Sequence, residues 1–144
     1  CALKNAIPFH IKAHGALYHA CNKHAMESDI LVEVFLKLCP ELFLLVAPFS
    51  VLEEKAKEAG IRTLTESFID RRYKEDLSLV SRTKEGAVIQ NVEQAKSQYR
   101  ALQSGHVYTN SGEEKPLISQ TACIHGDNSQ CLEILSSIRS NGNV

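Results

Sequence analysis

The sequence has 144 residues, of which 44% are hydrophobic and 23% charged, which is enough for one domain with a hydrophobic core. The 16 basic and 17 acidic side chains leave a net charge of −1, which provides no basic surface for nucleic acid or for an anionic membrane. The longest apolar run, residues 42–49, is far shorter than the ~20 residues of a membrane span. We therefore expect neither a nucleic-acid-binding protein nor a membrane protein.

The cysteines and the N-terminus indicate the cellular compartment. The five cysteines are irregularly spaced and form no C-x-x-C pair, so reduced thiols are expected rather than a disulfide framework or a zinc site. No secretory signal is visible. These features predict a cytoplasmic protein. Because the chain begins with Cys1 rather than methionine, we also expect a fragment or a processed product.

Strand and helix patterns alternate at the beginning of the chain. Residues 7–13 predict a short strand, and a helix is expected to follow directly over 15–25. A second helix is expected over 29–39, capped by Ser28 or Asp29.

The next segments continue the alternation. The continuous apolar run 41–47 predicts a strand buried on both faces. Ser50, with Glu53 three residues later, forms a capping-box pattern for a helix that ends near Gly60. Residues 61–69 are expected to be extended.

The second half of the chain begins with a polar segment, residues 70–89, that has no sustained hydrophobic period and predicts a long excursion. The remaining elements are expected in this order: a helix over 91–105 capped by Asn91, a hairpin or loop over 106–116, a strand within 118–127, and a capped helix over 128–142 that ends at Gly142. Strands alternating with helices predict an α/β fold with a parallel sheet. Because no segment has the composition of a linker, residues 1–144 are expected to form a single domain.

Ionisable residues follow three of the predicted strands. Lys12 and His14 follow the first strand, Asp70, Arg71 and Arg72 follow the third, and His125 and Asp127 follow the last. Parallel strands place their carboxyl ends on one rim, where α/β folds bind ligands. The sequence therefore predicts that residues more than a hundred positions apart lie close together.

Each of these groups has a simpler interpretation. Asp127 fits a helix N-cap, and His14 with Gly15 fits a strand-to-helix turn. The cluster of Asp70 with its two following arginines fits a surface ion-pair cluster of small energetic consequence. Lys12 fits a side chain that extends from a strand end to solvent. The functional interpretation rests on the joint pattern.

If the rim is a site, residue chemistry suggests roles. Asp70 or Asp127 suits a general base or a group that polarises water, and His14 or His125 suits proton transfer near neutral pH. Arg71 or Arg72 suits bidentate binding of a substrate carboxylate, whereas Lys12 suits stabilisation of an oxyanion. This combination fits a small acidic substrate with a carbonyl or amide centre.

Other motifs are weak or absent. The chain has no GxxxxGK[ST] phosphate loop and no GxGxxG sequence, so it shows no nucleotide motif. The histidines at 10, 14, 19 and 24 are poorly spaced for one helical face, and we expect no metal site from them.

Three long segments resemble one known family. "IKAHGALYH" (11–19) resembles VKPHGALYN, and "ESFIDRRYKEDLSLVSRTKEGAVI" (66–89) resembles E-x-F-x-D-R-x-Y-x-x-D-G-x-L-V-P-R-x-x-x-G-A-x-I. "QTACIHGD" (120–127) resembles QT-x-C-x-HGD. All three are motifs of the LamB/YcsF family, the lactam-utilisation proteins described as the A subunit of 5-oxoprolinase. Order and spacing agree from about Phe9 onwards.

The resemblance implies a seven-stranded (β/α) barrel of the glycoside hydrolase/deacetylase type, a group linked to carbohydrate metabolism. It implies ATP-dependent opening of 5-oxoproline (pyroglutamate) to L-glutamate, with ATP as cosubstrate and subunits B and C as partners. The motif positions that carry over are Lys12, His14, Gly15, Tyr18, Glu66, Asp70, Arg71, Tyr73, Arg82, His125 and Asp127. Combined with the rim, they give candidate catalytic residues Asp127, His125, His14 and Asp70, and candidate substrate-binding residues Lys12, Arg71, Arg72, Tyr73 and Arg82.

The chain departs from the family pattern in specific places. Ala13 and Ser81 replace prolines, and Leu77 replaces a glycine. Family members also carry DLN-x-DLGE, CGFHAGD and GAHPS-like segments upstream of the region matched here. We therefore expect the C-terminal part of such a barrel, an incomplete barrel with an open edge that is inactive by itself. Alternative functions are another (β/α) hydrolase or deacetylase acting on a carbohydrate or a different lactam, and a non-catalytic degenerate paralogue.

Overall fold

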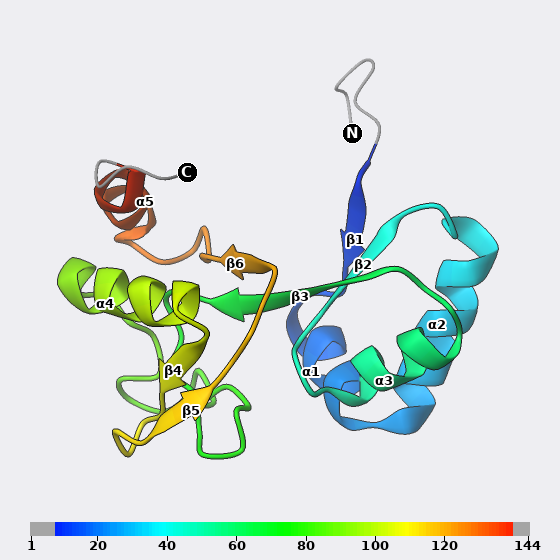
Figure 1. Cartoon of the computed structure of the whole chain (residues 1–144), viewed down its shortest axis with the longest axis horizontal. Helices are drawn as coiled ribbons and strands as arrows, with labels where there is room; N and C mark the ends of the chain where they lie inside the picture. The colour runs from blue at the N-terminus through cyan, green and yellow to red at the C-terminus, as the bar shows by residue number, and fades with distance from the viewer. Residues whose placement is uncertain (1–7, 140–144) are drawn as a thin grey trace. The chain divides into compact units, whose positions relative to one another are not determined.

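The computed structural model describes residues 8–139, and the chain divides into two compact units, Cys1–Glu66 and Ser67–Val144 (Figure 1). The order of helices and strands agrees with the order predicted from the sequence. That residues 1–144 act as a single domain stays a prediction. Among the described residues, no helix is long and apolar enough to cross a membrane.

The first unit consists of parallel strands connected by helices. Its elements are β1 (His10–Lys12), α1 (Gly15–Lys23), α2 (Ala25–Leu38), β2 (Phe43–Val46), α3 (Val51–Glu58) and β3 (Thr63–Phe68), whose last two residues belong to the second unit. β1 pairs with β2 and β2 pairs with β3, both in parallel, with His10 opposite Phe43 and Leu44 opposite Thr63. The predicted α/β class with parallel strands is therefore confirmed.

The start of α3 follows the predicted capping box. Ser50 is the N-cap, and its hydroxyl accepts the backbone N–H of Glu53 at 3.1 Å. The Glu53 carboxylate in turn accepts the N–H of Phe49 at 2.7 Å. Because these bonds satisfy donors that a helix start leaves without partners, they fix where α3 begins. Gly60, with φ +71°, ends the helical segment as predicted.

The predicted start of α2 was wrong. The helix begins at Ala25 after His24, which has extended dihedrals, and neither Ser28 nor Asp29 is its N-cap. The single proton of the Ser28 hydroxyl is instead shared between the backbone carbonyls of His24, at 2.9 Å, and Cys21. Asp29 lies within the helix and forms an ion pair with Lys55 at 3.3 Å. A serine hydroxyl can donate to a backbone carbonyl or accept from a backbone N–H, and here its bonds connect α1 to α2.

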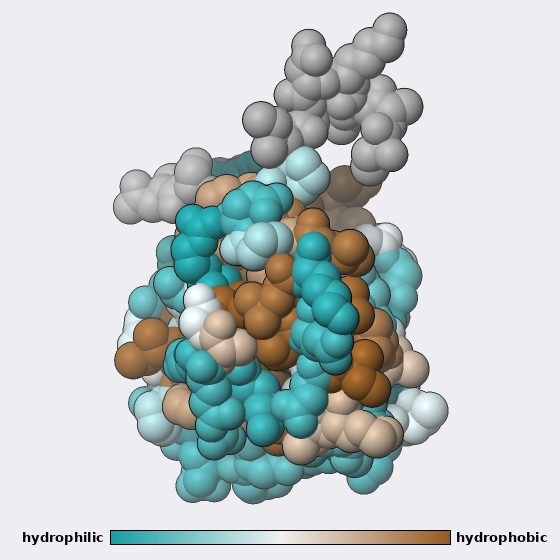
Figure 2. All heavy atoms as spheres, turned by 90° about the vertical axis from the view of Figure 1, so that its right-hand side faces the viewer, coloured by the Kyte–Doolittle hydropathy of each residue, from teal (hydrophilic) through white to brown (hydrophobic). Residues whose placement is uncertain are grey.

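The hydrophobic core of the first unit lies between its helices and strands. Its buried residues are Cys21, Val32, Phe35, Leu44, Val46, Leu52, Ala56 and Ile61. The opposite face of α2 exposes a row of apolar side chains at four-residue spacing, namely Met26, Ile30, Val34 and Leu38. Figure 2 views the side on which α2 lies in Figure 1 and shows hydrophobic side chains at the surface among hydrophilic ones.

The second unit contains the end of β3, two helices and three short strands. These are α4 (Val92–Gln103), β4 (His106–Tyr108), β5 (Glu114–Pro116), β6 (Thr121–Cys123) and α5 (Cys131–Arg139). β6 is the hydrogen-bonded neighbour of β3 in the sheet, and β4 with β5 forms the predicted antiparallel hairpin. Asn91 caps α4 as predicted, because its side chain accepts the N–H of Gln94 at 3.0 Å.

The predicted start of α5 was also wrong. The helix begins at Cys131 rather than at residue 128, and Asp127 does not cap it. Asn128 precedes the helix, is buried, and accepts the N–H of Gln130 through its side-chain oxygen at 3.0 Å. The predicted end at Gly142 lies outside the described residues.

Residues 70–89 form the predicted excursion, built from turns and isolated bridges between Arg71 and Val88 and between Tyr73 and Leu79. Leu77, which stands where the family has glycine, adopts φ 62°. This left-handed conformation is costly for a residue with a Cβ atom, and it explains why the family pattern carries glycine there.

The second unit has a small hydrophobic core of its own, formed by the buried residues Ile69, Ile89, Ala95, Ile134 and Ile138.

Candidate functional site

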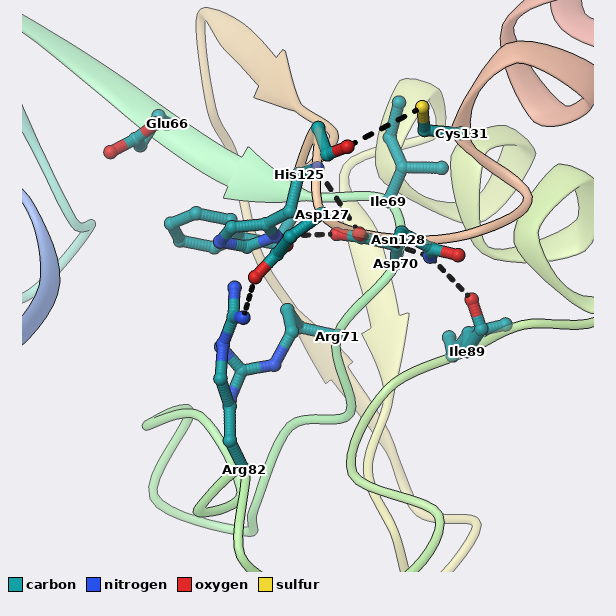
Figure 3. A network of polar contacts seen from close by, with 12 residues as sticks. Glu66, Ile69, Asp70, Arg71, Arg82, Ile89, His125, Asp127, Asn128 and Cys131 are labelled. Atoms are coloured by element: carbon teal, nitrogen blue, oxygen red, sulfur yellow. Dashed lines mark hydrogen bonds and ion pairs between the residues drawn. The ribbon is translucent and has the colours of Figure 1, made fainter.

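Asp70 lies two residues beyond the end of β3 and is completely buried. Its Oδ1 is 2.8 Å from His125 Nδ1, and its Oδ2 accepts the backbone N–H of His125 at 3.1 Å (Figure 3). His125 itself follows β6, which is the neighbour of β3. Two predicted rim residues 55 positions apart are therefore joined by two hydrogen bonds.

Asn128 and Phe68 hold this pair from the other directions. The Asn128 side-chain amide donates to Asp70 Oδ2 at 3.2 Å and to the Ile89 carbonyl at 3.0 Å. The His125 ring stacks on Phe68 with a centroid separation of 5.3 Å and an interplanar angle of 12°. The position of the His125 imidazole is thus fixed by the Phe68 ring and by the Asp70 carboxylate, which Asn128 holds in turn.

The charge of Asp70 decides the tautomer of His125. Burial raises the pKa of Asp70, but the hydrogen bonds from His125 and Asn128 outweigh burial and hold this pKa below its usual range. The carboxylate is therefore ionised at neutral pH and acts only as an acceptor. A neutral His125 bonded to it carries its proton on Nδ1, which leaves Nε2 as the basic nitrogen. This is the carboxylate–imidazole arrangement that orients a general base.

Asp127 forms an ion pair with Arg82, with 2.6 Å between Oδ2 and the guanidinium. Both side chains are exposed, and the hydrogen bond from Arg82 lowers the pKa of Asp127 despite an opposing contribution from desolvation. The pair connects the excursion to the loop after β6. An ionised carboxylate whose pKa is held below its usual range by a bonded arginine is a poor proton acceptor at neutral pH.

The other candidates in the second unit have structural partners. Arg71 is buried and donates to the Val80 carbonyl at 2.7 Å, and burial, followed by the positive charge of Arg82, lowers the pKa of its guanidinium. The Arg72 guanidinium donates to Gln94 on α4 at 2.9 Å. The buried Tyr73 hydroxyl accepts the Phe68 N–H at 2.7 Å, which fixes the residue beneath the His125 ring.

The first unit contains a second polar pair. Lys12 Nζ is 2.6 Å from Glu66 Oε2 and 5.5 Å from the centroid of the Tyr18 ring. Glu66 is buried, and its Oε1 has no hydrogen-bond partner among the described residues. His14 is exposed at the N-cap of α1 and makes no side-chain cap bond. Gly15 has φ +57°, a conformation that suits glycine at this strand-to-helix turn.

The structure therefore brings together part of the predicted rim. Asp70 joins His125, and Asp127 joins Arg82, within the second unit. Lys12 and His14 belong to the first unit, so a rim shared by all of these residues stays a prediction. Among residues 8–139, no group of three His, Cys, Asp or Glu side chains could hold a metal ion.

Sequence reasoning missed Asn128, Phe68 and Gln98 as supports of the pair. Asparagine is common at helix starts, so residue type alone places Asn128 there. Phe68 has the pattern of one more apolar strand residue. Gln98 carried a usable signal, because it is a polar residue on the buried face of α4, next to Ala95 and Ala101.

Known proteins similar to this chain share its motifs and fold. Two proteins named as the A subunit of 5-oxoprolinase are similar over 90% of the chain: the one from Clostridium beijerinckii is 36% identical over 131 residues, and the one from Coprothermobacter proteolyticus is 38% identical over 133. The crystal structure of a lactam utilization protein from Thermus thermophilus matches 91% of the chain at 30% identity with a TM-score of 0.81.

These matches cover only part of the relatives. The chain spans 51% and 50% of the two curated relatives and 52% of the crystallised protein, about half their length. The likeness supports the expected fold class, because the crystallised protein shares the arrangement of parallel strands and helices. The model of the LamB/YcsF family matches residues 2–143. With nearly the whole chain matched, this protein belongs to the LamB/YcsF family.

Proposed function

We propose that the chain is part of a 5-oxoprolinase A subunit, which opens 5-oxoproline to L-glutamate with ATP as cosubstrate and with subunits B and C as partners. The observation that carries the proposal is the 2.8 Å contact between buried Asp70 and His125 Nδ1. The names of the relatives add support, because two of them are called the A subunit of 5-oxoprolinase. A cytoplasmic location is part of the same proposal and agrees with the free thiols of Cys21, Cys39 and Cys131.

The proposed chemistry assigns His125 the proton transfers. Its Nε2 takes a proton from a water molecule whose oxygen bonds to the lactam carbonyl carbon. The ring C–N bond then breaks, and the nitrogen receives the proton as it becomes the amine of glutamate. Asp70 keeps the imidazole oriented and stabilises its protonated form. ATP hydrolysis supplies the free energy that the family reaction requires.

Other candidates receive binding roles in this proposal. Arg82 and Arg71 suit the substrate carboxylate, because guanidinium groups bind carboxylates bidentately. Lys12 suits the oxyanion that develops on the lactam carbonyl. His14, which is exposed at the start of α1, remains a candidate for proton exchange with solvent. Asp127 is proposed to hold Arg82 rather than to act as the base.

The test uses the full-length protein with its partner subunits, ATP and 5-oxoproline, and measures glutamate release. His125→Asn should lower kcat by about 100-fold or more, the usual contribution of a general base. His106→Asn is the matched control, since this histidine belongs to β4 and packs edge-on to Tyr108. Near-normal turnover of His125→Asn would remove the proposed base.

Three further measurements separate the alternatives. Turnover of N-acetylated sugars in place of 5-oxoproline would favour a carbohydrate deacetylase. Near-normal turnover in both Asp127→Asn and His14→Ala would exclude these two residues from the chemistry. Because the chain spans half the length of its relatives, we expect the 144 residues mixed with partner subunits and ATP to be inactive, and robust turnover would contradict this.

A further inference from the structure

Gln98 is a buried polar residue on the apolar face of α4. It is 6% exposed, and its neighbours on the same helix face, Ala95, Ala101 and Leu102, are buried as well. A buried amide lowers stability unless it is hydrogen-bonded, so its partners indicate why glutamine occupies this position.

The partners of Gln98 are backbone carbonyls on both sides of Asp70. Its Nε2 donates to the carbonyls of Phe68, Ile69 and Arg71 at 2.6, 3.1 and 2.8 Å. An amide group has two N–H bonds, so at least one of them is shared between two acceptors. One side chain therefore holds three carbonyls within four consecutive residues.

The remaining carbonyl of this segment, that of Asp70, accepts the N–H of Ile89 at 2.9 Å. β3 ends at Phe68, so the rest of this segment lies beyond the regular strand. Backbone groups that are buried outside a sheet need other partners. Here Gln98 provides most of them, and it does so immediately around the residue that binds His125.

We propose that Gln98 is a positioning residue for the Asp70–His125 pair. It fixes the backbone from which the Asp70 carboxylate projects, and the carboxylate fixes the tautomer and orientation of His125. Gln98 touches neither His125 nor the reacting atoms, so its effect passes through Asp70. This inference rests on the proposed function only for its catalytic consequence, because the positioning itself is measurable without turnover.

The direct test is the tautomer of His125, read from the ¹⁵N chemical shifts of its ring in the 144-residue chain. In the wild type we expect the Nδ1–H form when the ring is neutral. Gln98→Met keeps the length of the side chain but removes both donors, and we expect it to produce a mixture of tautomers. Gln103→Met is the matched control on the same helix, since Gln103 is exposed and its amide donates to Tyr99 at 3.3 Å. An unchanged tautomer in Gln98→Met would overturn the proposal.

A second measurement needs no variant and remains decisive if Gln98→Met fails to fold. The side-chain amide protons of Gln98 should exchange with solvent far more slowly than those of exposed Gln103. Equal exchange rates for the two amides would overturn the proposal, because a side chain bonded to three carbonyls cannot release its protons as an exposed one does.

Kinetics of the full-length enzyme with its partners then separate positioning from the proposed function. We expect Gln98→Met to lower kcat by about 10-fold or more with KM little changed, because small misplacements of a catalytic group are costly. Gln103→Met should keep wild-type kcat. A changed tautomer with unchanged kcat would support the positioning role and overturn the catalytic role of the Asp70–His125 pair. An unchanged tautomer would overturn the positioning role whatever happens to kcat.

Discussion

Replacing Asp70 with asparagine preserves the size of the side chain but changes its hydrogen bonding. The wild-type carboxylate accepts three hydrogen bonds, from His125 Nδ1, the His125 backbone N–H and Asn128 Nδ2, at 2.8, 3.1 and 3.2 Å. In the variant one oxygen becomes an NH₂ group: at the Oδ2 position it faces two donors, and at the Oδ1 position it faces His125 Nδ1, which can accept only if the imidazole changes to its Nε2–H tautomer. The Asn128 amide cannot easily flip to compensate, because it also donates to Ile89 and accepts from Gln130.

The expected loss of stability follows from these contacts. A hydrogen bond to a charged group contributes about 1.5–3 kcal/mol, and a buried donor left without a partner costs a similar amount. We expect Asp70→Asn to lower the free energy of unfolding by about 3 kcal/mol, since each of the three hydrogen bonds loses its charged acceptor at a cost of about 1 kcal/mol. For a chain of this size the corresponding fall in Tm is about 6–12 °C.

The assay is equilibrium urea unfolding with thermal unfolding in parallel, and Asp127→Asn is the control. Asp127 undergoes the same chemical change, but its ion pair with Arg82 is exposed to solvent. Exposed ion pairs contribute little to stability, so we expect the control to unfold close to the wild type. Equal losses in the two variants, or a larger loss in Asp127→Asn, would refute the assignment of Asp70 as the buried anchor of the network.

Three other outcomes are expected. Leu77→Gly and Leu79→Gly each remove a half-buried leucine, but only the first relieves backbone strain, about 1 kcal/mol at φ 62°. Leu77→Gly should therefore be clearly less destabilising than Leu79→Gly in urea unfolding. Ser50→Ala should lower the free energy of unfolding by about 1 kcal/mol, because it removes the side-chain cap of α3. Ser104→Ala should leave this free energy unchanged, because the backbone N–H makes the cap at that position, and calorimetry would show the difference. Because folding lowers the pKa of Asp70, its contribution to stability is complete above the ordinary carboxyl pKa near 3.9 and is lost as pH falls through the lower folded value. In acid titrations followed by circular dichroism, Asp70→Asn should flatten this loss of stability. An unchanged acid slope would count against the lowered pKa.

The fold was predictable where residue type and position agree. The capping box of Ser50 and Glu53 indicated the start of α3 because a single set of local bonds satisfies that sequence. The start of α2 could not be assigned this way, because the Ser28 hydroxyl has two possible kinds of backbone partner. Only the packing of α1 against α2 decides between carbonyl and N–H.

The part of the site made by ionisable residues directly after the strands was predictable from the sequence. Asp70 and His125 follow neighbouring strands, so their proximity could be inferred from order alone. The supporting residues could not, because Asn128 and Gln98 act through contacts 58 and 27–30 positions away in the chain. A residue's type does not specify a partner at such a distance. Leu77 shows the converse, since the departure from glycine was visible but its left-handed backbone was not.

The exposed apolar row on α2 has a practical consequence. Its first member, Met26, is the sole methionine among the 144 residues and is 67% exposed. Labelling methionine with a ¹³C methyl group therefore gives one signal from one position on this face. The position of that signal, and the rate at which peroxide converts the thioether to the sulfoxide, would both change whenever another surface covers α2.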